Sequence, residues 1–235
     1  MKVETRAVWV AVAMAVIVTT GLVNAGLITY VDADLTNTTI DGEPLEVGVN
    51  YTSPTGNGTN GLWQYRTVWG TTFNGDGVWQ TDQANSTADA EDTAPLKVDF
   101  TLPDAGLYDL YVLFFNNNSN DGAWDIAVRI GEDGDFVNYN RTSPEVSLAI
   151  ADEFEAGVTI ATGNDRHVKA LIGTYFASAA NETVSIYVNG LDSWGDDVAR
   201  DQRTVFDGVG YSVVPEPATM VLLGLGGLTA LKRKR

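Results

Sequence analysis

The chain of 235 residues carries 31 acidic and 14 basic residues, which gives a formal net charge of −17 at pH 7. A surface this acidic repels nucleic-acid phosphates, so nucleic-acid binding is excluded as a function. The sequence has no cysteine and a single histidine. Disulfide bonds and thiol chemistry are therefore excluded as well, and stability has to come from the core or from bound ions.

The N-terminus has the pattern of a cleaved export signal. Lys2 and Arg6 precede the apolar stretch 7–18, and the small residues Val23 to Ala25 suit a signal peptidase. We therefore predict a signal peptide over residues 1–25. An uncleaved N-terminal anchor is the alternative.

The centre of the chain, about 190 residues long, fits one domain built of short β-strands. Apolar and polar residues alternate in 96–102, 124–130 and 184–188, as in strands with one face in the core and one in water. Residues 108–115 are apolar on both faces toward their end, as in a strand covered on both sides. Further strands are predicted at 27–31, 45–51, 62–69, 77–81, 136–139, 167–176 and 205–213.

Short segments rich in Gly, Pro, Asn and Asp separate these strands, and these residue types adopt turn conformations at low energetic cost. The segments are 74–77, 103–106, 133–134 and 189–190. Many short strands with such turns indicate an all-β fold, an antiparallel β-sandwich for which we expect the jelly-roll topology. The segment FTLPDAGLYDLYVLF, residues 100–114, resembles a strand pair of galactose-binding-like and carbohydrate-binding-module sandwiches. This resemblance implies the same kind of sandwich.

Polar loops rich in Asp and Asn are candidates for a calcium site. Calcium takes about six to eight oxygen ligands, which carboxylates, amides and carbonyls on loops can supply. The candidate ligands come from two polar segments. Asn117 and Asp121 lie in one, and Asp192, Asp196 and Asp197 lie in the other. Acidic residues in 32–34 and 132–135 form similar clusters, and each of these clusters also suits a solvated turn.

Trp194 is the main candidate for contact with a sugar, because it lies in the polar stretch 191–197, where burial of its ring is hard to explain. Aromatic faces stack on the apolar faces of sugar rings, and the neighbouring Asp192 and Asp196 can accept hydrogen bonds from hydroxyl groups. Trp79, beside a predicted turn, is the second candidate. A place in the core is the alternative for both tryptophans.

Catalytic residues are hard to nominate from this sequence. His167 begins an apolar strand, and no Gly-x-Ser-x-Gly motif presents a nucleophile for it. We expect His167 to be a strand-edge residue and the protein not to be an enzyme. A glycan-active hydrolase with two catalytic carboxylates is the least favoured alternative, because so many acidic residues single out no pair.

The C-terminus combines Pro215-Glu216-Pro217, the apolar run 219–231 and the basic residues 232–235. These three parts, in this order, resemble the PEP-CTERM sorting signal of bacterial surface proteins. The resemblance implies export and recognition by an exosortase, a membrane enzyme that removes the tail. The apolar run makes about 20 Å of helix against about 30 Å of hydrocarbon, which suits a handle that is later removed. A permanent tail anchor is the alternative.

We assign residues 215–235 to this signal and residues 26–214 to the exported domain. Without residues 1–25 and 215–235, the chain keeps 29 acidic and 8 basic residues, a formal charge of −21. We expect a non-catalytic protein of the cell surface or extracellular matrix that binds carbohydrate or exopolysaccharide, with Ca2+ as the candidate ion. A structural or adhesive matrix protein without a small ligand is the alternative.

Overall fold

The computed structural model describes residues 26–40, 43–44, 63–66, 77–81, 95–116, 125–158, 166–190 and 204–215. The chain separates into two units: one is formed by Met1–Gly26 and Val213–Arg235, and the other by Leu27–Ser212. The architecture that the structure describes belongs almost entirely to the second unit. Among the described residues, no helix is long and apolar enough to cross a membrane.

The first sheet has seven strands. Its order is β10 (Val146–Leu148), β11 (His167–Ala177), β7 (Gly106–Phe115), β13 (Val205–Val213), β5 (Val78–Thr81) and β4 (Trp63–Arg66). The seventh strand, β1 (Thr29–Asp32), pairs with residues 208–211 of β13, beyond the residues that pair with β5. Gly208 permits this pairing, because a Cβ atom there would lie 2.6 Å from the carbonyl oxygen of Val31.

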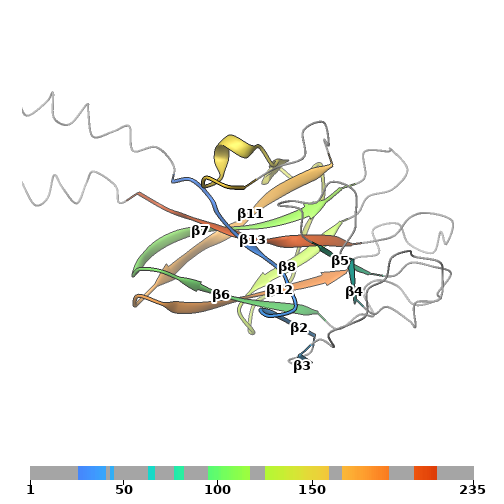
Figure 1. The fold of residues 1–235 in the computed structure, drawn as a ribbon, viewed down its shortest axis with the longest axis horizontal. Helices are drawn as coiled ribbons and strands as arrows, with labels where there is room; N and C mark the ends of the chain where they lie inside the picture. Colours follow the sequence, from blue (N-terminus) through green and yellow to red (C-terminus); the bar gives the residue numbers. More distant parts are fainter. Residues whose placement is uncertain are drawn as a thin grey trace, which may run out of the picture. The chain divides into compact units, whose positions relative to one another are not determined.

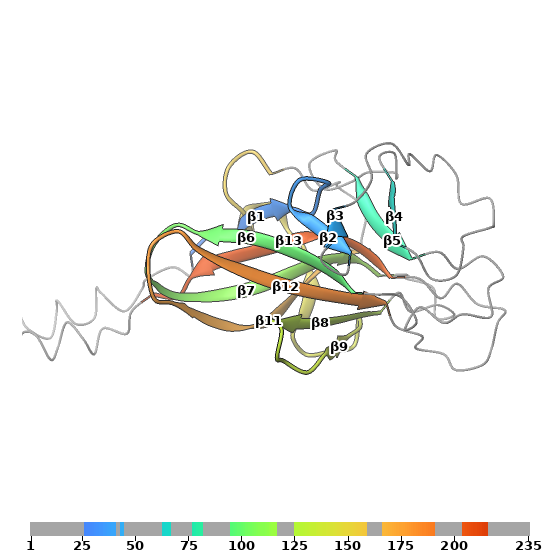
Figure 2. The same cartoon turned by 90° about the horizontal axis from the view of Figure 1, so that it is seen from below.

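The second sheet has six strands, in the order β3 (Glu43–Pro44), β2 (Thr38–Ile40), β6 (Leu96–Leu102), β12 (Glu182–Gly190), β8 (Ile126–Ile130) and β9 (Val137–Tyr139). Neighbouring strands pair in antiparallel register, for example β12 with both β6 and β8. Figures 1 and 2 show the two sheets as the two layers of a sandwich. The predicted all-β antiparallel sandwich is confirmed, whereas the jelly-roll topology stays a prediction.

The core lies between the sheets and follows the alternation seen in the sequence. Every second residue of β6 from Leu96 to Leu102 is buried, and the residues between them are partly or fully exposed. On β7, every second residue from Tyr108 to Phe114 belongs to the same core. Apolar burial between the sheets, worth about 25 cal/mol per Å² of surface, therefore provides the main stabilisation of the fold.

A strap formed by residues 149–158 packs on the first sheet, on the side away from this core. It contains the 3-10 turn η3 (Ala151–Glu153), and its Phe154 packs with Leu113 of β7. Lys169 of β11 donates a hydrogen bond of 2.6 Å to the carboxylate of Glu153. The end of β7 is therefore covered on both faces, as the sequence predicts.

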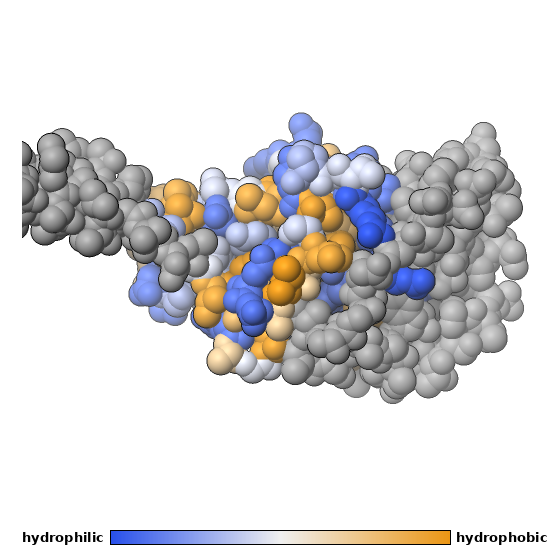
Figure 3. Space-filling model, turned by 90° about the horizontal axis from the view of Figure 1, so that it is seen from above, coloured by the Kyte–Doolittle hydropathy of each residue, from blue (hydrophilic) through white to orange (hydrophobic). Residues whose placement is uncertain are grey.

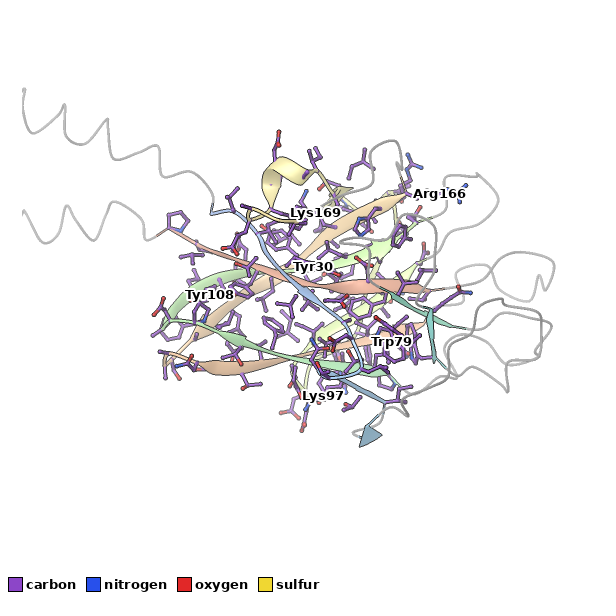
Figure 4. All side chains as sticks on the ribbon, viewed as in Figure 1. Tyr30, Trp79, Lys97, Tyr108, Arg166 and Lys169 are labelled. Carbon is purple, nitrogen blue, oxygen red and sulfur yellow. The ribbon has the colours of Figure 1, made fainter. Side chains whose placement is uncertain are left out.

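The two ends of the sandwich differ in construction. At the hairpin end, residues 103–105 join β6 to β7, and residues 178–181 join β11 to β12. At the loop end, the end of β7 pairs with the start of β11, and the end of β12 pairs with the start of β8. Figure 4 shows Tyr108 toward the hairpin end and Trp79 and Arg166 toward the loop end.

The turn predicted at residues 103–106 is confirmed. The turn predicted at Asn189–Gly190 is wrong, because both residues belong to β12 and pair with Ala127 and Ile126 of β8. Hydrogen bonds to the neighbouring strand outweigh the turn preference of these two residue types. The strand predicted at 45–51 lies outside the described residues.

Candidate functional site

The loop end holds most of the buried polar side chains that the structure describes. Six of the nine buried polar or charged residues lie there: Gln80, Asn116, Asp125, His167, Thr204 and Asp207. Burial of a polar group costs free energy unless the group finds a partner. This concentration makes the loop end the polar centre of the domain.

Asp207 of β13 lies at the centre of this cluster. Its side chain is fully buried, and its Oδ2 lies 3.2 Å from Nε2 of His167, whose side chain is 3 % exposed. The ring of His167 also stacks on Phe115, with 4.5 Å between the ring centroids. The pair links β11 to β13 across β7, which lies between them. Because both side chains are buried, we infer that the pair has a structural role.

Tyr30 extends the cluster toward the surface. Its hydroxyl lies 3.2 Å from Oδ2 of Asp207 and 3.0 Å from Oδ1 of Asp32, to either of which it can donate its proton. Burial, and then the two carboxylates, raise the pKa of Tyr30 well above its ordinary value. The neutral hydroxyl is therefore the form that joins β1 to β13 at this point.

The sequence identifies neither the partner of His167 nor the role of Asp207. The two residues are far apart in the chain, and nothing local links them. A signal is nevertheless present, since Asp207 stands inside the predicted apolar strand 205–213. A carboxylate at such a position needs a partner, and the chain offers only one histidine.

The structure brings together the strand ends that carry the two candidate loops. One loop, residues 117–124, leaves β7 after Asn116 and returns at Asp125. The other loop, residues 191–203, leaves β12 after Gly190 and returns at Thr204.

These ends meet at two places. Gly190 pairs with Ile126, the first residue of β8. The hydroxyl of Thr204 donates a buried hydrogen bond of 2.7 Å to the carbonyl oxygen of Asp125. The two loops that carry the predicted sugar and calcium residues are therefore anchored side by side.

The predicted site residues of these loops all lie outside the described residues: Asn117, Asp121, Asp192, Trp194, Asp196 and Asp197. Within the described part of the chain, no three His, Asp or Glu side chains are placed together to hold a metal ion. Asp34, from another acidic cluster, accepts hydrogen bonds from the amide and hydroxyl groups of Thr36, at 2.7 and 2.6 Å. These contacts give Asp34 the role of a turn residue.

Trp79 lies in the core, the alternative that the sequence leaves open for it. Its side chain is 2 % exposed, and its indole N–H donates a hydrogen bond of 2.6 Å to the carbonyl oxygen of Ala33. Its ring also packs against Tyr65, with 5.0 Å between centroids. In this position the ring has no exposed face for a sugar.

The outer face of the second sheet carries a row of long side chains that sequence reasoning did not single out. Lys97, Tyr187 and Arg129 are direct neighbours across β6, β12 and β8. The guanidinium of Arg129 lies 4.8 Å from the ring centroid of Phe136 and 4.6 Å from that of Tyr187. Because Arg129 occupies these aromatic faces, the row is a weaker candidate for sugar stacking than the loop end.

No curated protein matches the sequence of this chain. One solved structure that it resembles comes from Clostridium thermocellum and contains the CBM22-1 and GH10 modules of endo-1,4-beta-D-xylanase 10B, complexed with xylohexaose. The sequence identity is 14 %, the TM-score is 0.28, and the match covers 66 % of this chain and 25 % of that one. This chain therefore spans about a quarter of that protein. The likeness is weak, and the assignment of a sandwich rests on the strands themselves.

A family model, described as the PEP-CTERM protein-sorting motif, matches residues 213–235. The predicted signal residues Pro215, Glu216 and Pro217 fall within this match. The motif implies processing by an exosortase and association of the C-terminus with a membrane. The chain therefore carries a PEP-CTERM sorting motif and is an exported protein directed to the cell surface.

Proposed function

We propose that the exported domain binds carbohydrate or exopolysaccharide through its loop end, without catalysis. One observation carries this proposal: the roots of loops 117–124 and 191–203 are neighbours, joined by the Gly190–Ile126 pairing and the Thr204–Asp125 hydrogen bond. Two polar loops on adjacent roots can form one site, whereas loops at opposite ends cannot. The sorting motif delivers this site to the outside of the cell.

The residues of loop 191–203 supply the chemistry that such a site needs. Trp194 offers an aromatic face for a sugar ring, and Asp192 and Asp196 offer acceptors for its hydroxyl groups. Five oxygen-bearing side chains on the two loops are the proposed source of Ca2+ ligands: Asn117, Asp121, Asp192, Asp196 and Asp197. Calcium would fix the two loops against each other and so order the sugar site.

A screen for binding to polysaccharides tests this proposal. Purified residues 26–214 are applied to a glycan array and to immobilised exopolysaccharides, once with calcium and once with a chelator. Trp194→Ala is expected to weaken binding by about tenfold or more, as loss of a central aromatic contact does. Phe176→Ala is the matched control, because Phe176 is an exposed aromatic residue at the hairpin end, 67 % exposed.

The outcomes separate the proposal from its alternatives. No binding to any glycan under either condition would leave a structural or adhesive matrix protein as the function. Binding that is as strong in Trp194→Ala as in Phe176→Ala would place the site elsewhere. A melting temperature that rises with calcium would support the proposed ion independently, because a ligand that binds only the folded state stabilises it.

A further inference from the structure

Two exposed apolar side chains lie next to each other at the hairpin end. Phe176 of β11 is 67 % exposed and Leu107 of β7 is 41 % exposed. They are direct partners in the β11–β7 register, so their side chains project from the same face of the sheet. In the view of Figure 3, apolar residues, in orange, lie beside hydrophilic ones, in blue, over the described surface. Scattered exposure is ordinary for a protein surface, so the location of this pair has to carry the argument.

The same end is where the domain connects to its membrane segment. β13 runs toward the hairpin end, where Tyr211 packs edge-on against Tyr108 with 5.7 Å between ring centroids. The sandwich unit ends at Ser212, and the apolar run of the sorting motif begins at Thr219. The six residues between them, 213–218, let Thr219 lie at most about 25 Å from Ser212, even when fully extended.

This tether restricts how the domain can face a bilayer. While the sorting motif is in the membrane, the hairpin end stays within about 25 Å of the lipid surface. Within the sandwich, the loop end is about 33 Å from the hairpin end, the length of the ten residues of β7. The tether therefore leaves Leu107 and Phe176 within reach of the lipid headgroups.

We propose that the hairpin end is a membrane-docking surface, on which Leu107 and Phe176 insert into the boundary between headgroups and acyl chains of the bilayer that holds the sorting motif. Shallow insertion of a few apolar side chains is how many proteins bind at this boundary. The proposal rests on the sorting motif and not on sugar binding.

The charges of this end favour a neutral lipid surface. Asp104 in the β6–β7 turn is exposed, and Glu182 follows the β11–β12 turn with its side chain partly exposed. Carboxylates near the headgroups are repelled by anionic lipids, and this repulsion weakens with salt. Docking is therefore expected to be stronger on phosphatidylcholine than on mixtures with an anionic lipid.

A single fluorescent probe can measure docking, because the chain has no cysteine of its own. The full chain is reconstituted through its C-terminal segment into phosphatidylcholine vesicles that contain nitroxide-labelled lipids. The substitution Asp104→Cys provides the only labelling site, at the tip of the hairpin end. Quenching of the probe by the lipids is then compared between the native background and the double substitution Leu107→Ser and Phe176→Ser.

We expect the double serine substitution to lower lipid quenching about threefold, because loss of two apolar contacts releases the hairpin end while the tether remains. Leu148→Ser is the matched control, since Leu148 is 44 % exposed and pairs with Val168 near the loop end. This control is expected to leave quenching unchanged. Thermal unfolding of each variant confirms that the fold is intact.

Two results would overturn the proposal. Equal quenching in all three backgrounds would show that the tether alone sets the distance of the probe from the lipid. Lipid-independent crosslinking of a Phe176→Cys chain to a second chain would show that the exposed pair contacts another copy of the protein instead. A loss of quenching with added anionic lipid would agree with repulsion by Glu182, which the labelled chain retains.

Discussion

The hairpin end and the loop end of the same sandwich are held together in different ways. At the hairpin end, the carboxylate of Glu182 accepts hydrogen bonds from the hydroxyl of Tyr175 and the amide of Ser178, seven and four residues away. At the loop end, Thr204 bonds to Asp125 across 79 residues of sequence, and Tyr30 bonds to Asp207 across 177 residues.

This difference separates local from non-local stabilisation. A contact between residues close in sequence closes a short loop of chain. The entropy lost on closing a short loop is small, so such a contact can form early in folding. A contact across most of the chain forms only when both sheets are in place. The loop end should therefore be the part of the domain that is most sensitive to loss of a single buried partner.

The largest effect is expected for His167→Ala. This change leaves the buried carboxylate of Asp207 without the imidazole that lies 3.2 Å away. Loss of a hydrogen-bond partner from a buried carboxyl group costs about 3 kcal/mol or more of unfolding free energy. Denaturant unfolding at pH 7 measures it. Thr174→Ala, an exposed change on the same strand, is the control, and an equal effect in both variants would contradict the importance of the pair.

A smaller effect is expected for Tyr30→Phe, which removes one donor from Asp207 and Asp32. Loss of such a bond to charged partners costs about 1 to 3 kcal/mol. Because the pKa of Tyr30 is raised in the folded state, its share of the stability is present below the ordinary tyrosine pKa and is lost as the pH rises beyond about 10.

The pH dependence gives this prediction its own test. Unfolding curves recorded between neutral and alkaline pH should fall more steeply for the native protein than for Tyr30→Phe. Tyr111→Phe, a change at another partly buried tyrosine of the first sheet, serves as the control for loss of a tyrosine hydroxyl. An alkaline slope that is identical in all three proteins would show that Tyr30 does not link the loop end to pH.

The same distinction explains which parts of the structure the sequence predicts. The strand 96–102 and the turn at 103–106 depend on alternation and on turn residues, both of which are local, and both are confirmed. Short strands such as β2 and β10, three residues each, are too brief for a period to be recognised. Asn189–Gly190 misleads because its neighbour β8, and not its own composition, decides its conformation.

The candidate site is predicted less well than the fold, for a physical reason. Trp79 and Trp194 both adjoin polar segments, so composition cannot separate a tryptophan of the core from one on a loop. The difference comes from the partners that the fold supplies, here the carbonyl of Ala33 and the ring of Tyr65. The His167–Asp207 pair is likewise created by the sheet order.

At the hairpin end, Asn181→Ala should have a moderate effect. Asn181 has a φ of 60°, a left-handed conformation that costs most residues about 1 to 2 kcal/mol, although Asn tolerates it. Asn181→Gly is the matched control and should be close to neutral, since glycine adopts this conformation freely. Denaturant midpoints measure both variants, and an alanine variant as stable as the glycine variant would contradict the expectation.

The smallest effect at neutral pH is expected for Glu182→Gln, because its side chain is partly exposed and its contacts are local. Hydrogen bonds from Tyr175 and from Ser178 lower the pKa of Glu182 to about 2. A carboxyl group with a lowered pKa in the folded state contributes stability above its unfolded pKa, and this contribution is lost as the pH falls from about 4.5 toward 2. Glu182→Gln should remove this part of the acid sensitivity.

Unfolding midpoints between pH 2 and 6 test this prediction for Glu182→Gln, with the exposed Asp152→Asn as control. If the acid slope of Glu182→Gln matches that of the native protein, the stability of the hairpin end does not depend on this carboxylate.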